Sequence, residues 1–391
     1  MLTAAVIGGG LAGGCVAWAL GKRGVRVTLY EAETTLCGKA SGNLFGVVMP
    51  YLAVKPSPLL TVYSAGYRYL HKLLRDTASV NNHFFQVGAL QLPSLARFSE
   101  LFADPRAVSN EGTIRAVSSS EASSLAGTTI QSDAIYISDA GFLKPSQFIN
   151  ALLTTVHAYV DIRCNFRVVK LQRLPNGSWQ LYHCDDQALQ SVDAVFVCTA
   201  FQASMFDQLS SLPLEPIRGQ TSLVRSSDVS SLLKSVVCYN GYVTPAVDGV
   251  HLLGAHYRHY DNRDEVDSCD TDDILGRCSR WLPELRVGST DVLSSRVCFR
   301  TSTFDRLPYA GAVPVDGSLI DSSCSGHGKS IGLFASLGHG SRGLLSAPLS
   351  AEIVVRAALG EDEAELKDVA ALLNPARFLE RQKVNTGTPP S

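Results

Sequence analysis

The stretch AAVIGGGLAGGCVAWALGKRGVRVTLYE, residues 4–31, decides the fold predicted for this chain. Residues 4–7 read as a buried strand, residues 11–20 favour a helix, and residues 25–29 alternate as a second strand. Glycines in G-x-G-x-x-G spacing connect the first strand to the helix: Gly8, Gly10 and Gly13. Glycine there permits a tight turn, close approach of the backbone to a pyrophosphate, and close packing of the helix on the strand. The order predicts a dinucleotide-binding unit; the alternative is a glycine-rich turn without a ligand.

Two details of this unit narrow the choice of dinucleotide. The first helical turn, which contains Leu11 and Ala12, would present free N–H groups and the positive end of the helix dipole to the phosphates. Glu31 ends the second strand, where a carboxylate bonds the hydroxyl groups of an unphosphorylated ribose. FAD or NAD is therefore favoured over NADP.

The loop that follows Glu31 favours FAD over NAD. An NAD domain normally continues here into its next helix, whereas this chain continues as CGKASGN, residues 37–43. Small and polar residues of this loop are predicted to bring donors to a pyrophosphate or a flavin edge: Ala40, Ser41, Gly42 and Asn43. Taken alone, the segment is equally consistent with an ordinary loop.

Three later segments complete the predicted nucleotide-binding part. Residues 165–184 read as a hairpin around a Pro-Asn-Gly turn, and Val168 on its first strand is predicted to contact the cofactor. Residues 193–200 read as a buried strand, and residues 332–359 repeat the order of strand, glycine-rich turn and helix. That turn supplies further predicted cofactor contacts: Gly338, Gly340, Ser341, Arg342 and Gly343. The second helix N-terminus would stabilise negative charge on a flavin, although a plain strand–turn–helix connection has the same pattern.

Length and composition set broader limits. The chain of 391 residues exceeds the usual size of one hydrophobic core, so two domains are expected. A net charge of −2 argues against global attraction to nucleic acid and leaves room for a local basic patch.

Ten cysteines without CxxC or Cys/His clustering argue against a metal site and favour a reducing, cytoplasmic compartment. Lys22 and Arg23 follow the uncharged first twenty residues and do not precede them, so neither a signal peptide nor a membrane span is expected. Residues 385–391 read as a disordered tail.

Segments spread over nearly the whole chain resemble those of the D-amino-acid-oxidase-like superfamily of FAD enzymes. The closer match is to one branch, the C-terminal oxidoreductase domain of MnmC, which modifies the wobble uridine of tRNA. The resemblance rests on GGGLAG near the start, ASGN at 40–43, QVGALQLP at 86–93, PIRGQTS at 216–222, RTSTFDRLPYAG at 300–311, LGHGSRGLLSAPLSAE at 337–352 and LNPARF at 373–378. The chain departs from the pattern at Leu44 and Phe45, where more polar residues are expected, and at Ala200, where glycine is common.

The resemblance implies an α/β fold with a Rossmann-type FAD-binding domain and a second, β-rich α+β substrate domain inserted in pieces. The FAD-binding domain would comprise residues 1–85, 144–218 and 300–391, and the substrate domain residues 86–143 and 219–299. The methyltransferase half of the bifunctional proteins is not expected in this chain. A separate methyltransferase that acts downstream is therefore a candidate partner.

The resemblance also implies the substrate-binding residues. Arg300 matches an arginine that holds a substrate carboxylate above the flavin, which suits the planar, permanently charged guanidinium; the alternative is an arginine paired with Asp305 or turned to solvent. Tyr242 and His256 are predicted to face the same pocket, although each is also consistent with a core residue. Arg218 could reach the pocket or fix the junction of the domains. Cys298 stands where some relatives attach FAD covalently, and a buried structural thiol is the preferred interpretation.

The implied reaction is FAD-dependent removal of the carboxymethyl group of 5-carboxymethylaminomethyl-uridine at the tRNA wobble position, which gives 5-aminomethyl-uridine and glyoxylate. Oxygen is the expected reoxidant, and tRNA the expected partner. The alternative is an oxidase of a free small amino acid or N-methyl amino acid, such as glycine or sarcosine, which the near-zero net charge favours slightly. A flavoprotein that binds tRNA without turnover is a third class.

Overall fold

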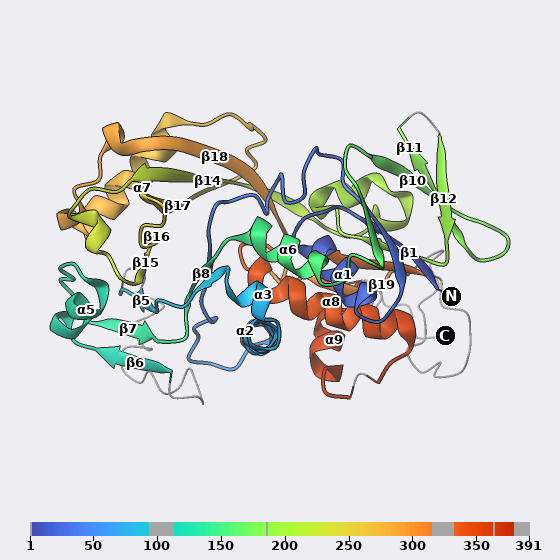
Figure 1. Ribbon diagram of the computed structural model, residues 1–391, viewed down its shortest axis with the longest axis horizontal. Helices are drawn as coiled ribbons and strands as arrows, with labels where there is room; N and C mark the ends of the chain where they lie inside the picture. The colour runs from blue at the N-terminus through green and yellow to red at the C-terminus, as the bar shows by residue number, and fades with distance from the viewer. Residues whose placement is uncertain (1, 94–112, 185–186, 315–331, 363, 379–391) are drawn as a thin grey trace, which may run out of the picture.

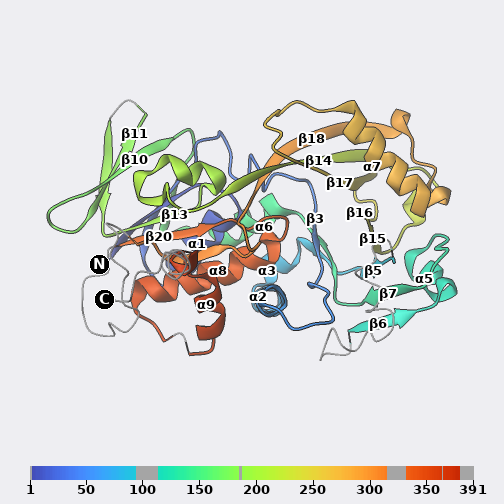
Figure 2. The ribbon, with the colours of Figure 1, turned by 180° about the vertical axis from the view of Figure 1, so that it is seen from behind.

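The computed structural model describes residues 2–93, 113–184, 187–314, 332–362 and 364–378 (Figure 1). The predicted tail at 385–391 lies outside the described residues. Two sheet-based halves lie side by side, and the long strands β14 and β18 run from one half toward the other in both views (Figures 1 and 2). No helix in the described part of the chain has the length and hydropathy needed to cross a bilayer.

A six-stranded sheet forms around the opening segment of the chain. Its strands lie in the order β19, β20, β13, β1, β2, β9, and neighbours are parallel except for β19 and β20. The bounds are β1 Thr3–Ile7, β2 Arg26–Tyr30, β9 Val160–Arg163, β13 Ala194–Val197, β19 Tyr309–Ala312 and β20 Leu333–Leu337. The predicted strands at 4–7, 25–29, 193–200 and 332–337 are confirmed with shifts at their ends. Both faces of this sheet are covered, which explains its continuous apolar strands.

Helices cover one face of this sheet and a hairpin sheet covers the other. Ala4 and Val6 of β1 belong to the core shared with the helices α1 Leu11–Gly21, α2 Pro58–Asp76, α6 Pro145–Thr154 and α8 Gly343–Leu359. Ala5 and Ile7 pack on the opposite side, in the core that includes Trp179. That side carries the antiparallel strands β10 Val168–Arg173, β11 Trp179–His183 and β12 Ala188–Val192. The predicted hairpin is confirmed.

An eight-stranded sheet forms the second half of the molecule. Its order is β18, β14, β17, β16, β15, β5, β7, β6, and its neighbours are antiparallel except for β15 and β5. The bounds are β5 Ala89–Gln91, β6 Ile114–Val117, β7 Ala134–Ile137, β14 Glu215–Arg225, β15 Val236–Tyr239, β16 Gly241–Val243, β17 Val250–His259 and β18 Val292–Ser302. The helix α7 Ser268–Trp281 packs on one face through Ile274, Leu275 and Cys278. Other residues of the sheet, among them Ala89, Ile135 and Val236, pack in a separate core with Phe45 and Phe142.

Short elements connect these layers. The strands β3 Gly46–Val48, β8 Gly141–Leu143 and β4 Phe84–Phe85 form a three-stranded sheet. The remaining α-helices are α3 Ala78–Asn81, α5 Ser119–Ala126 and α9 Lys367–Leu373. Short 3-10 helices occupy Ala200–Met205, Asp207–Leu209, Ser230–Leu232, Pro283–Leu285 and Ser289–Asp291. Phe45, which replaces an expected polar residue, is buried against Phe142 of β8 in an edge-to-face contact, so it serves the core here.

Candidate functional site

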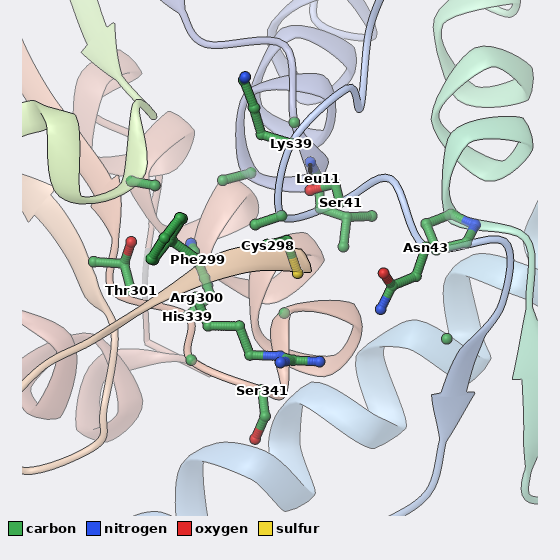
Figure 3. A pocket seen from close by; sticks show the side chains of 18 of the residues that line it. Leu11, Lys39, Ser41, Asn43, Cys298, Phe299, Arg300, Thr301, His339 and Ser341 are labelled. Carbon is green, nitrogen blue, oxygen red and sulfur yellow. Dashed lines mark hydrogen bonds between the residues drawn. The ribbon is translucent and has the colours of Figure 1, made fainter. Parts of the chain in front are cut away.

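One cavity of about 1150 Å³ lies between the two large sheets, which exceeds the usual range of about 300–1,000 Å³ for small-molecule pockets. Almost all of the residues predicted for the site line it: Gly8, Gly10, Leu11, Ala12, Glu31, Ala40, Ser41, Asn43, Val168, Tyr242, His256, Arg300, Gly338, Gly340, Ser341, Arg342 and Gly343. Gly13 and Gly42 were also predicted to contact the cofactor but are not among the residues that line the cavity. Figure 3 shows loop, strand and turn residues from distant parts of the sequence around this space.

The glycine turn at the start of α1 is held by close backbone contacts. Gly8 has a φ of +99°, and a Cβ on it would approach the Cys198 carbonyl oxygen to 2.6 Å. A Cβ on Gly13 would collide with the Gly8 carbonyl, so Gly13 serves helix-on-strand packing and not ligand contact. The helix begins without an acidic residue in its first turn, and its N-terminal end opens on the cavity. Such an end favours an anion.

Glu31 is fixed by backbone donors at the edge of the cavity. One carboxylate oxygen accepts from Gly9 N at 2.6 Å and the other from Glu33 N at 2.8 Å. Each oxygen keeps further acceptor capacity. The carboxylate is therefore held in one orientation while it can still accept from a ribose hydroxyl.

The loop at 37–43 is clamped from the opposite sheet. Ser41 Oγ accepts from the N-terminal amide of α1, Leu11 N, at 2.9 Å. Arg296 of β18 donates to the Gly38 carbonyl at 2.8 Å, to the Lys39 carbonyl, and to Asn43 Oδ1 at 3.2 Å. A Cβ on Gly42 would lie 2.6 Å from Arg296 Nη2, so Gly42 makes room for the clamp.

The turn before α8 places a second helix N-terminus on the cavity. The helix starts at Gly343 without an acidic residue in its first turn. His339 spans the turn, because its Nε2 contacts Ser336 Oγ at 3.1 Å and its Nδ1 contacts Ser346 Oγ at 2.9 Å. Burial lowers the pKa of His339 to about 4, so the ring is neutral at physiological pH. Gly340 N also donates to the Thr301 carbonyl at 2.8 Å, which ties this turn to β18.

Consecutive residues of β18, from Arg296 to Thr301, line the cavity. Arg296, Cys298 and Arg300 share one face of the strand, as the two-residue period requires. Arg300 extends into the pocket (Figure 3). Its Nη1 is buried without a hydrogen-bond partner among the described residues, and its Cζ lies 4.5 Å from the ring centroid of Tyr257. Burial acts to lower the pKa of Arg300, but its neighbours, Tyr257 foremost, raise it above the ordinary value.

Asp305 is not the partner of Arg300. Its carboxylate is bound by Arg377 at 3.0 Å. The alternative of an Arg300–Asp305 pair is therefore wrong, and so is that of a solvent-turned side chain. Within the described residues, Arg300 forms no ion pair that would neutralise it.

Tyr242 shares the cavity with Arg300. Burial, with a smaller contribution from Tyr257, raises the pKa of Tyr242, so its hydroxyl stays protonated and can donate. A Cβ on Gly254 of the neighbouring strand would lie 2.6 Å from the Tyr242 hydroxyl oxygen. The tyrosine thus lies across a glycine.

His256 lines the cavity wall, but its ring nitrogens face carboxylates. Nδ1 contacts Asp273 at 2.6 Å, and Nε2 lies 3.5 Å from Asp270. These contacts leave the imidazole little freedom for a ligand, and its substrate-binding role stays a prediction.

Arg218 resolves an open alternative, whereas the interpretation of Cys298 as a structural thiol that does not attach FAD stays a prediction. Arg218 is buried and pairs with the buried Asp270, and it donates to the Glu265 carbonyl at 2.7 Å. It does not line the cavity and instead joins β14 to α7. Cys298 is a free, buried thiol on the cavity wall.

Three residues that the sequence reasoning missed belong to this site: Gly219, Arg296 and His339. Gly219 lies within PIRGQ, a segment that the sequence analysis singled out, and Cβ placed on it would collide with Arg300 Nη1. Arg296 and His339 act on loops far away in sequence. The one available signal was the even, four-residue spacing of Arg296 and Arg300, which places both side chains on one face of a strand.

Orphaned polar atoms on the cavity wall fit a bound dinucleotide. Thr199 Oγ1, Thr301 Oγ1 and Arg300 Nη1 are buried without a partner in the described part of the chain, and all three residues line the cavity. Leaving a buried polar group unsatisfied costs about 1–3 kcal/mol, so such atoms mark positions that favour a polar ligand. Thr199 adjoins the Gly8 turn, and the two helix N-termini suit phosphate and an anionic ring edge. The residues present therefore fit FAD.

A Rossmann-type sheet whose glycine turn opens on a large, cation-bearing cavity defines a dinucleotide-dependent oxidoreductase. The chain belongs to the FAD dependent oxidoreductase family, whose model matches residues 3–357. FAD is therefore its cofactor, as predicted, and the predicted α/β fold class is confirmed.

A sequence relative supports the same family assignment. A tRNA 5-methylaminomethyl-2-thiouridine biosynthesis bifunctional protein MnmC from Methylobacillus flagellatus is 32% identical over 396 residues. The alignment covers 97% of this chain, and the chain spans 59% of the length of that relative. The predicted resemblance to MnmC is confirmed at this level.

Solved structures share the fold. Glycine oxidase from Geobacillus kaustophilus superimposes with a TM-score of 0.75 and 19% identity, over 93% of this chain and 96% of that one. Iminodiacetate oxidase from Chelativorans sp. BNC1 gives a TM-score of 0.75 and 22% identity, over 92% of this chain and 96% of that one.

Proposed function

We propose that this chain oxidises 5-carboxymethylaminomethyl-uridine at the tRNA wobble position and releases the carboxymethyl group as glyoxylate. Its site is the cavity between the two sheets, and the observation that carries the proposal is Arg300. Its buried guanidinium faces this cavity and has no ionic partner among the described residues, while the acid nearest to it in sequence is bound by Arg377. A buried charge of this kind needs a counterion, and the proposed base offers the carboxylate of an N-substituted glycine.

The residues of the chain bind and orient the substrate. Arg300 holds the carboxylate, which fixes the adjacent carbon, and the protonated hydroxyl of Tyr242 donates to the bound group. Bound FAD supplies the oxidising power, because it accepts a hydride from carbon next to an uncharged amine. Loss of the hydride and of the amine proton leaves an imine, and water converts it to glyoxylate and the primary amine of 5-aminomethyl-uridine. No acid–base pair beyond an unprotonated amine is required.

In this proposal, FAD is bound by the helix N-termini and loops that line the cavity. The α1 and α8 N-termini would hold the phosphates and the anionic ring edge, and Glu31 would accept from ribose. Arg296 keeps the loop at 37–43 in place. Val168 and the turn at 338–343 complete the wall.

The proposed domains follow the sheets closely. We assign residues 1–85, 144–218 and 300–391 to FAD binding and residues 86–143 and 219–299 to substrate binding. All six strands of the parallel sheet fall in the first group. β14 begins before residue 219 and β18 ends after residue 300, so these two strands cross the boundaries and connect the two parts.

The name of the MnmC relative supports tRNA as the substrate and a further methylation. A primary amine must gain a methyl group to become the 5-methylaminomethyl group in that name. We therefore propose that a methyltransferase acts on the product, in a cytoplasmic setting where tRNA is available.

Oxidation of a free amino acid is the second candidate. Arg300 would serve glycine or sarcosine equally well, the net charge of −2 provides no global attraction to RNA, and two structural neighbours are named as oxidases of small amino acids or their analogues. The chemistry at the site would be identical.

One experiment separates the two candidates. FAD-loaded protein is incubated in air with tRNA that carries the modified base, with the same tRNA lacking the modification, and with glycine or sarcosine. Glyoxylate and 5-aminomethyl-uridine formed from the modified tRNA support the proposal. Hydrogen peroxide from the amino acids with no product from the tRNA would replace it with the second candidate.

A further inference from the structure

Arg300 reaches the cavity by crossing a neighbouring strand at a residue that has no side chain. Arg300 is paired with Ile217 of β14, and Gly219 two residues on is paired with Cys298 on one side and Tyr257 on the other. A Cβ on Gly219 would collide with Arg300 Nη1 and would lie 3.3 Å from Tyr257 Cε1. The guanidinium therefore occupies the space that a side chain at 219 would fill.

The backbone at Gly219 does not itself require glycine. Gly219 lies within β14 and is paired on both sides, just before the register against β17 shifts between Gln220 and Thr221, and its φ is not in the left-handed region. Glycine in a strand interior is unfavourable by about 0.5–1 kcal/mol relative to alanine. Close approach of another group is the remaining physical reason for glycine here.

Tyr257 closes the other side of the guanidinium. Its ring centroid is 4.5 Å from Arg300 Cζ, a cation–π distance, and the residue is 43% exposed. The phenol thus supports the guanidinium plane and leaves its edge for a ligand. Tyr242 against Gly254 repeats the arrangement on the neighbouring strands, so two of the three side chains predicted to bind substrate, Arg300 and Tyr242, lie across glycines.

We propose that Gly219 and Tyr257 form a seat that sets the direction of the Arg300 guanidinium and thereby selects small carboxylates in one orientation. Both are positioning residues that act through Arg300. The seat rests on the proposed function only for the identity of the natural substrate, because carboxylate binding is measurable without turnover.

The test uses methoxyacetate, in which an ether oxygen replaces the amine, so that it cannot be oxidised as an amine. Its dissociation constant is read from the flavin absorbance of FAD-loaded wild type, Gly219→Ala, Arg300→Lys and the double variant. We expect Gly219→Ala to weaken binding by roughly tenfold to a hundredfold, the worth of a charge-assisted hydrogen bond. Arg300→Lys should reduce methoxyacetate affinity far less in the Gly219→Ala background than in wild type. In that background the cation at 300 is already displaced from the carboxylate, so replacing the guanidinium removes little further binding.

Gly276→Ala is the matched glycine control. A Cβ there meets nothing within 4 Å, and Gly276 lies exposed on α7 and is not among the residues that line the cavity. Its methoxyacetate affinity should equal that of wild type. A Gly219→Ala protein that loads FAD and binds methoxyacetate like the control would overturn the seat, and so would full additivity of the two substitutions.

Tyr257 gives a second, independent readout that holds if Gly219→Ala fails to fold. Tyr257→Phe keeps the ring face and should bind methoxyacetate nearly as wild type does, whereas Tyr257→Leu should weaken binding by about fivefold or more, the value of a cation–π contact. Equal affinities for the two variants would remove Tyr257 from the proposal. If the variants show the expected non-additive effects on methoxyacetate affinity but modified tRNA yields no glyoxylate, the seat stands and the proposed substrate is rejected. If modified tRNA yields glyoxylate but the effects on affinity are additive, the proposed substrate stands and the seat is rejected.

Discussion

Arg377 binds both carboxylate oxygens of Asp305, through Nε at 3.0 Å and Nη2 at 3.1 Å. The same guanidinium donates to the Leu307 carbonyl at 2.7 Å and lies 4.2 Å from the ring centroid of Tyr309. A planar fork held in this way is among the stronger ion pairs in proteins. The pair fixes the segment after β18 and keeps Asp305 away from Arg300.

Breaking this pair should destabilise the fold. Arg377→Gln leaves Asp305 half-buried without a cation, and we expect a loss of about 3 kcal/mol in the free energy of unfolding at neutral pH. Denaturant unfolding measures the loss. Arg68→Gln, at an exposed position of α2, is the control and should change stability little.

The dependence of stability on pH in the acid range supplies a second check on the Arg377–Asp305 pair. Burial acts to raise the pKa of Asp305, but the Arg377 guanidinium holds it below the usual range. A carboxyl with a depressed folded pKa stabilises the protein above its unfolded pKa, near 3.9, and that contribution is lost as the pH falls through the folded value. Wild type should therefore lose more stability on acidification than Arg377→Gln does. If the free energy of unfolding falls equally with decreasing pH in wild type and in Arg377→Gln, the pairing would be contradicted.

The Arg296 clamp should govern FAD affinity. Arg296→Ala removes three donors to the loop at 37–43 without touching the glycine turn. We expect FAD to bind roughly tenfold to a hundredfold more weakly, as measured by flavin fluorescence on reconstitution of the apoprotein. Arg225→Ala is the control, because Arg225 is exposed at the end of β14 and is not among the residues that line the cavity. Equal FAD affinity in both variants would show that the loop holds its shape without the clamp.

His339 should make stability depend on pH below neutrality. Burial lowers its folded pKa from 6.5 to about 4, so between these values the unfolded chain binds more protons than the native one. The free energy of unfolding should therefore rise with pH across this window, and fall as pH is lowered from 6.5 toward 4. His339→Gln keeps an amide to bridge the serines but cannot titrate. The unfolding midpoint of His339→Gln should change less than that of wild type between about pH 4 and pH 6.5. If the midpoints of the two proteins change equally with pH, another group causes the pH dependence.

Ala200 shows the cost of a missing glycine. Its φ is +57°, in the left-handed region, at the end of the strand that leads to the cavity. Ala200→Gly should raise the free energy of unfolding by about 1 kcal/mol, because only glycine takes this conformation without strain. Ala203→Gly, at a fully buried position of the same 3-10 helix, should lower stability and serves as the control. Thermal unfolding of the two variants in opposite directions is the expected result.

Local patterns made much of the first sheet predictable. The strands and helices within 4–31 and 332–359 lie where apolar periodicity and glycine spacing put them, because each signal is contained in a few consecutive residues. The predicted cavity residues come together because parallel strands end at one edge of the sheet. The family resemblance supplied the candidate role of Arg300, whereas FAD was already favoured by Glu31 and by the loop at 37–43.

Contacts between distant segments were not predictable. Arg218 was left open between pocket and junction because its partner Asp270 lies 52 residues further on, and the freedom of Arg300 depends on an Arg377 that lies 72 residues after Asp305. Nothing local in PIRGQ shows that an arginine from another strand fills the space at Gly219. Such roles depend on register between strands, which the hydrophobic pattern alone does not specify.

Anaerobic reduction of bound FAD by tRNA that carries 5-carboxymethylaminomethyl-uridine tests most directly whether Arg300 anchors the reacting group. Wild type should lose its oxidised-flavin absorbance on mixing. Arg300→Gln, with the same FAD content, should be reduced about 10²-fold to 10³-fold more slowly at equal tRNA concentration, the effect of removing one partner of a buried charge pair. Equal reduction rates in the two proteins, or no reduction of wild type by this tRNA, would contradict the proposed function.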